Sequence, residues 1–164
     1  MRGGLRERWR ELPRWARGVL AVYGIGFLQG ACFHFVVLAQ GGVHGYAAFA
    51  PLPLRVFFAC LLVLDPLIAV LVGLARPAGV PLEGGVMVLD AAANWLVNWP
   101  QVRDDPAWLL RPVGLLPITL FCLFVLATQV PLLRVIKGNG PRRGGGDPSS
   151  TAVHNRRTGP RSPA

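Results

Sequence analysis

Charged residues are scarce in the middle of this sequence. Asp, Glu, Lys and Arg make up 15% of its 164 residues, whereas about 25% is usual for a soluble domain. The few charges gather toward the two ends, and long uncharged stretches fill the centre. Hydrophobic residues reach 52%, a distribution typical of a chain whose centre is solvated by lipid rather than water. We therefore predict an integral membrane protein.

Motifs that fix a reaction are lacking as well. The sequence has no Gly-rich phosphate-binding loop, nucleophile elbow, HExxH zinc motif or paired carboxylates of the hydrolase type. Its three cysteines, Cys32, Cys60 and Cys122, lie in apolar stretches without ligand-like spacing, and their odd number argues against a disulfide framework. We expect them to pack between helices as small apolar side chains. We expect no cofactor.

Positive charge, by contrast, is abundant. The net charge is +9, and all but one of the basic residues are arginines. These arginines flank apolar stretches and form no patch on a folded domain, so anionic lipid is the expected partner and nucleic acid is not. The many Arg, Ala, Gly and Pro residues are typical of a GC-rich bacterial genome, and we expect a bacterial plasma membrane as the location.

Four stretches are apolar enough to predict transmembrane helices, at residues 18–39, 54–75, 84–99 and 113–136. At about 1.5 Å per residue, the first reaches about 33 Å, enough to cross the hydrocarbon core. A cleaved signal peptide is the alternative for this stretch, which is longer than the roughly 7–15 apolar residues of a signal sequence. The predicted fold is all-α, an up-down bundle of four transmembrane helices formed by residues 18–136.

The two ends of the chain differ from its centre. Residues 1–17 are basic and place Leu5, Trp9 and Leu12 on one helical face, which predicts an amphipathic segment at the membrane interface. Residues 137–164 are rich in Gly, Pro, Ser and Arg, which predicts a disordered basic tail. Because Arg and Lys concentrate beside the first and last spans, both termini are expected in the cytoplasm. That orientation requires an even number of spans.

Polar side chains inside the predicted spans are the candidate functional residues. Ionisable groups are costly in lipid and usually face other helices. The candidates are Asp65, Asp90, Asn94, Asn98, Gln29, His34 and Gln129. Asp90, Asn94 and Asn98 recur every four residues and predict one polar stripe along the third span. His34 alone cannot build a metal or haem site, so no metal is expected.

Two sequence patterns predict local helix geometry. Asp65 is followed by Pro66, which lacks an N–H group, so a kink or break is expected there, with Asp65 capping the second half-helix. A protonatable or cation-binding site at a broken helix is the alternative interpretation of Asp65. Gly26 and Gly30 form a GxxxG step, which predicts close approach of another helix.

Estimated depths place the polar groups of all four spans at matching levels, where they could bond to one another. This favours a non-enzymatic accessory or structural membrane subunit, and the sequence is compatible with homo- or hetero-oligomers. The alternative is a small proton- or cation-coupled transporter that uses Asp65 and Asp90. A third hypothesis is a membrane-embedded enzyme acting on lipid or isoprenoid, for which the sequence offers no reactive constellation.

Overall fold

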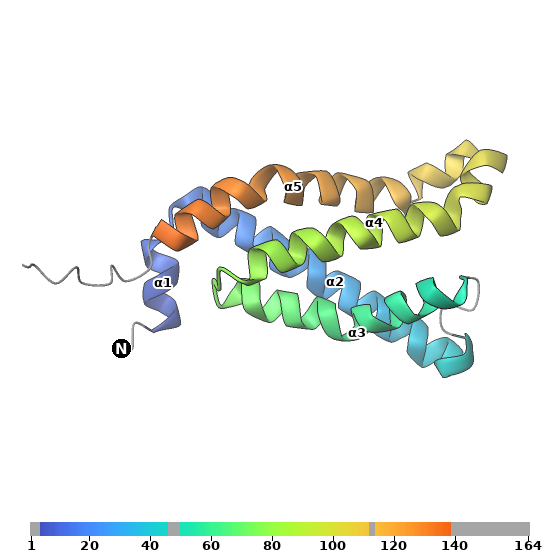
Figure 1. Cartoon of the computed structure of the whole chain (residues 1–164), viewed down its shortest axis with the longest axis horizontal. Coiled ribbons are helices and arrows are strands. Elements are labelled where there is room, and N and C mark those ends of the chain that lie inside the picture. The colour runs from blue at the N-terminus through green and yellow to red at the C-terminus, as the bar shows by residue number, and fades with distance from the viewer. Residues whose placement is uncertain (1–3, 46–49, 112–113, 139–164) are drawn as a thin grey trace, which may run out of the picture.

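The computed structural model describes residues 4–45, 50–111 and 114–138. Within these ranges the chain is helical and has no strand. The elements are α1 (Leu5–Glu11), α2 (Arg14–Gly45), α3 (Leu52–Gly73), α4 (Gly79–Asp104), the 3₁₀ helix η1 (Pro106–Leu110) and α5 (Leu115–Gly138) (Figure 1). Four of them, α2 to α5, are long and apolar enough to span a membrane, as the sequence predicted.

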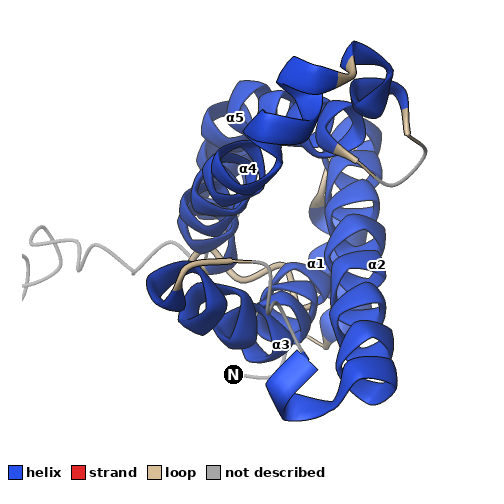
Figure 2. Cartoon of the chain, turned by 90° about the vertical axis from the view of Figure 1, so that its right-hand side faces the viewer, coloured by secondary structure: helices blue, strands red, loops and turns tan. Residues whose placement is uncertain are grey.

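The four long helices lie side by side in a ring. Contacts join α2 to α3, α3 to α4, α4 to α5, and α5 back to α2 (Figure 2). Helix α1, the α3–α4 turn and the end of α5 lie at one end of the molecule, which we call the α1 end (Figure 1). The end of α2, the start of α3 and the 3₁₀ helix lie at the opposite end, which we call the η1 end.

Proline and positive φ angles mark where the helices end or bend. Pro13 separates α1 from α2, because its ring fixes φ and it has no N–H to continue the first helix. Gly42 adopts φ 62° and kinks α2 near its end. Ala75, with φ 47°, turns the chain after α3 and is the non-glycine residue with positive φ in the described part.

The boundary between the N-terminal segment and the first long helix lies earlier in the structure than the predicted boundary at residues 17 and 18. Residues 1–17 do not form one helix, because α1 ends at Glu11 and the following arginines begin α2. The indole Nε1 of Trp9 donates a 2.9 Å hydrogen bond to the carbonyl oxygen of Gly73, at the end of α3. Leu12 is buried and Trp9 is partly buried against the core, whereas Leu5 is exposed, so only part of the predicted apolar face packs on the long helices.

The third long helix extends well beyond its predicted span of 84–99. Helix α4 begins at Gly79 and ends at Asp104. Its first turns carry Val80 and Glu83 into the interior, where both are buried. The charge of Glu83 therefore does not mark the end of the helix. At the other end of the chain, α5 continues to Gly138, and the rest of the predicted tail lies outside the described residues.

A kink or break was expected at Asp65–Pro66, and the helix does not break there. Helix α3 is continuous from Leu52 to Gly73 with Pro66 inside it, so Asp65 is an interior helical residue rather than an N-cap. Pro66 still removes one backbone donor. The residue Asp65 is 5% exposed, and its side chain is turned toward α2, which gives it partners other than the backbone amides it was expected to cap.

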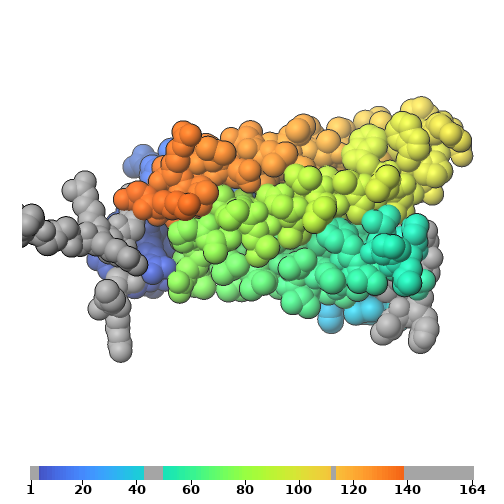
Figure 3. Space-filling model, viewed as in Figure 1, coloured from blue at the N-terminus to red at the C-terminus, as the bar shows by residue number. Residues whose placement is uncertain are grey.

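Large apolar side chains cover the outside of the ring. They include Ile25 and Phe35 on α2, Val63 on α3, Leu96 on α4 and Leu123 on α5. Figure 3 shows one side of the molecule, on which α3, α4 and α5 pack closely along their length. Four such helices suggest a membrane protein.

Among the cysteines, Cys122 is buried as expected, whereas Cys32 and Cys60 are exposed rather than packed between helices.

Candidate functional site: a polar cluster inside the helices

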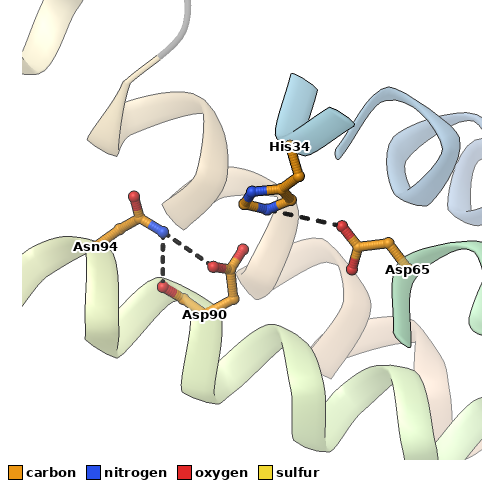
Figure 4. A network of polar contacts seen from close by, with 4 residues as sticks. All are labelled: His34, Asp65, Asp90 and Asn94. Atoms are coloured by element: carbon orange, nitrogen blue, oxygen red, sulfur yellow. Dashed lines mark hydrogen bonds and ion pairs between the residues drawn. The ribbon is translucent and has the colours of Figure 1, made fainter. Parts of the chain in front are cut away.

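Ionisable side chains from three helices converge inside the ring. His34 comes from α2, Asp65 from α3 and Asp90 from α4, and Asn94 lies one turn after Asp90 (Figure 4). We call these four residues the central polar cluster. The imidazole Nε2 of His34 lies 3.9 Å from Oδ2 of Asp65. Asp65 and Asp90 are near enough for the charge of one to act on the other.

Asp90 is held by its own helix. The Nδ2 group of Asn94 donates to Oδ1 of Asp90 and to its backbone oxygen, both at 3.0 Å. Asn98 repeats the pattern, donating at 2.9 Å to the backbone oxygen of Asn94. Its Oδ1 atom accepts a 3.2 Å hydrogen bond from the indole of Trp108 in η1. The predicted stripe therefore exists on α4, and the two amide donors bond along the helix.

Two glycines of α2 shape the interior on two different sides. A Cβ atom at Gly30 would lie 2.7 Å from Oδ2 of Asp65, so the absent side chain makes room for that carboxylate. A Cβ atom at Gly26 would collide with the ring of Phe121 on α5. The GxxxG step thus permits close approach, as such motifs do. Its two glycines face different helices: Gly30 faces α3 and Gly26 faces α5.

Apolar rings surround His34. The centroid of its imidazole lies 6.0 Å from that of Phe33 and 6.5 Å from that of Phe58 on α3. The side chain of His34 is 15% exposed and that of Asp65 is 8% exposed. Little water surrounds this pair, so its electrostatic attraction is screened less than on a protein surface.

Besides Asn98, which bonds to its edge, two of the predicted polar residues lie outside this cluster. Gln29 is exposed on α2 and does not share the interior with Asp65, although the two were expected at the same depth. Gln129 on α5 is half-buried, and its amide oxygen lies against Gly84 of α4. The expected mutual pairing of all polar groups is therefore replaced by local clusters.

A second polar cluster joins α2 to α5 nearer the α1 end. The hydroxyl of Tyr23 lies 3.1 Å from the backbone oxygen of Val125, to which it can donate. It also lies 2.5 Å from Oγ1 of Thr128. Thr128 donates its own hydrogen to the backbone oxygen of Phe124 at 2.6 Å. Tyr23 is fully buried, so it fastens α2 to α5 from within.

Sequence reasoning missed Glu83, which it placed at the edge of the third span. Glu83 is fully buried, and neither carboxylate oxygen has a hydrogen-bond partner among the described residues. Its side chain interacts electrostatically with Tyr23. A signal was available, because Glu83 precedes Asp90 by seven residues and thus lies on the face that carries Asp90 and Asn94. Extending the stripe by two turns would have included it.

The chemistry open to the central polar cluster is proton exchange. Imidazole and carboxylate groups gain and lose protons readily, and such groups inside membrane helices mark proton or ion pathways. Over the described ranges, no three His, Cys, Asp or Glu side chains are grouped to hold a metal ion. Comparison with known proteins gave no match to a protein-family model, a curated protein or a solved structure.

Proposed function

We propose that the chain is a small proton-coupled transporter of the plasma membrane, with the central polar cluster as its proton-binding site. In this proposal α2 to α5 form an up-down bundle with both termini in the cytoplasm. Four helices of sufficient length and an apolar outer surface support the membrane location. The arginines at the α1 end support the orientation, and would lie against anionic lipid.

One observation carries the transport proposal: His34 and Asp65 lie 3.9 Å apart, and Asp90, from a third helix, points toward the same part of the interior. A charged Asp at the centre of a membrane helix costs about 2.5–3.5 kcal/mol on insertion scales. A purely structural contact could be made with uncharged amides at lower cost. An imidazole beside two carboxylates can hold or release a proton by small side-chain movements, which is what coupling to a proton gradient needs.

The test is proton flux into liposomes that contain the purified protein and an entrapped pH-sensitive dye. Asp65→Asn and Asp90→Asn remove the exchangeable proton and keep the side-chain shape, and Asn at position 90 still offers an oxygen to Asn94. We expect both variants to reduce flux to the level of empty liposomes. The matched control is Asp104→Asn, at the exposed end of α4, which should leave flux unchanged. Unaltered flux in folded Asp65→Asn and Asp90→Asn would sink the proposal.

The second candidate is an accessory membrane subunit in which the same residues act only as structural contacts. The observation in its favour is that several interior side chains bond across helices. The indole of Trp95 on α4 donates at 2.9 Å to the hydroxyl of Thr119 on α5, and Tyr23 joins α2 to α5. On this reading the wild-type protein shows no flux, and Asp65→Asn and Asp90→Asn lower thermal stability in detergent instead.

A further inference from the structure

Glu83 is the interior carboxyl that the central polar cluster does not use. It is 0% exposed and lies on α4, two turns nearer the α1 end than Asp90. Within the described ranges, both of its oxygens lack a hydrogen-bond donor. While the hydrogen of Tyr23 is directed to α5, an ionised carboxylate in that position would have no hydrogen-bond donor, which is strongly unfavourable. A protonated carboxyl needs only an acceptor.

Tyr23 on α2 can supply that acceptor. Thr128 gives its hydrogen to the backbone oxygen of Phe124, so its Oγ1 atom is free to accept from Tyr23. The single hydrogen of Tyr23 is therefore directed to α5, either to Thr128 or to the backbone of Val125. The lone pairs of its oxygen remain, and Tyr23 is near enough to act electrostatically on Glu83, although by distance and angle neither Glu83 oxygen makes a hydrogen bond as the side chains lie.

We propose that Glu83 is a second proton-binding group. While Glu83 is protonated, the Tyr23 hydroxyl donates its hydrogen bond to α5. When Glu83 loses its proton, the Tyr23 hydroxyl donates to the Glu83 carboxylate instead. In the release step, the O–H bond of Glu83 breaks and the proton passes to a water molecule. The electron pair stays on the carboxylate, which then accepts the hydrogen of Tyr23. No other bond breaks, and nothing is oxidised or reduced. Its part in transport rests on the proposed function.

The groups around Glu83 make Tyr23 the responding partner. From α2 the titratable group that interacts with Glu83 is Tyr23 itself. From α5 come the hydroxyl of Thr128 and the amide of Gln129, which lies against Gly84, and neither titrates. The interior aspartates, Asp65 on α3 and Asp90 on α4, belong to the central polar cluster. The protonation of Glu83 therefore acts on the hydrogen bonds between α2 and α5.

Infrared spectroscopy of the protein in liposomes tests the proposal directly, since a protonated carboxyl has a carbonyl band that a carboxylate lacks. We expect a carboxylic-acid band in the wild type, of which the component due to Glu83 disappears in Glu83→Gln while any component due to Asp65 and Asp90 remains. The control Glu7→Gln, on the exposed surface of α1, should retain it. Tyr23→Phe removes the acceptor and should shift the band toward that of a carboxyl without a hydrogen bond. An identical band in Glu83→Gln, or an unshifted one in Tyr23→Phe, overturns the proposal.

Proton flux separates this proposal from the transport function. Suppose that flux is lost in Asp65→Asn and Asp90→Asn but the infrared band is unchanged in Glu83→Gln. This result would support the transport function and contradict proton binding by Glu83. The reverse pattern, no wild-type flux but loss of the Glu83 component of the band in Glu83→Gln, would reject transport and retain the proton on Glu83. If both proposals hold, Glu83→Gln loses both that component and the flux.

Discussion

Gly30 of α2 and Asp65 of α3 approach each other so closely that a Cβ atom on residue 30 would lie 2.7 Å from the carboxylate Oδ2. That same oxygen lies 3.9 Å from Nε2 of His34, one turn further along α2. Gly30 and His34 thus both lie close to the same atom, Oδ2 of Asp65. Gly30 makes room for the carboxylate, and His34 provides its polar contact.

Gly30→Ala should therefore disturb the central polar cluster. The added methyl group must push the Asp65 carboxylate aside, and overpacking of this kind costs about 1–3 kcal/mol. We expect a lower midpoint of thermal unfolding in detergent. Gly24→Ala is the matched control, because nothing lies within 4 Å of a Cβ atom at that position. Equal midpoints for the two variants would contradict the close contact.

The docking of α1 depends on the indole of Trp9. In Trp9→Phe the ring remains but the hydrogen bond to the carbonyl oxygen of Gly73 is lost, at a cost of about 1 kcal/mol. We expect faster hydrogen–deuterium exchange of the α1 amides, with little change in α4. Trp15→Phe serves as control, since Trp15 is 46% exposed. Exchange rates in α1 that match the wild type would show that the bond does not hold this helix.

The contact between Trp95 and Thr119 links α4 to α5. Thr119→Val keeps the volume of the side chain but leaves the Trp95 indole without its acceptor, which should lower the free energy of unfolding by about 1 kcal/mol. Chemical unfolding in mixed micelles measures the loss. Thr119→Ser restores a hydroxyl and should recover most of it. If valine and serine behave alike, the hydrogen bond contributes nothing measurable.

The proposed orientation is tested by fusing alkaline phosphatase, which is active only outside the cytoplasm, at chosen points. Fusion after Ala164 or Arg76 follows an even number of spans and should give an inactive enzyme. Fusion after Asp105 follows three spans and should give an active one. The opposite pattern would place both termini outside, and activity at only one of Arg76 and Ala164 would change the number of spans.

The number of long helices was predictable because it depends on the length of uncharged stretches, which is a property of the sequence alone. Their ends were less predictable, as Glu83 shows. A charged residue usually marks the edge of a membrane span, yet here the helix carries it inside, where Tyr23 lies beside it. Pro66 was expected to kink or break α3, and a single missing backbone hydrogen bond did not end a helix packed along its length.

The polar stripe on α4 was predictable from spacing, whereas the partners of its residues were not. Spacing fixes the face of a helix, but the neighbour that meets the face depends on how the helices rotate and slide. His34 rather than Gln29 meets Asp65, because Gly30 lets the carboxylate approach α2 at that level. Gln29 points outward. Membrane insertion, transport and the role of Asp90 remain predictions.

The contacts between helices are most extensive for α2 with α3 and for α4 with α5, which are neighbours in sequence. His34 meets Asp65 within the first pair, and Trp95 meets Thr119 within the second. Each sequential helix pair thus contains a polar contact of its own. If the chain inserts into a bilayer as proposed, we expect the α2–α3 pair to be able to enter before α5 has been translated, with Tyr23 joining α2 to α5 once both pairs are in place.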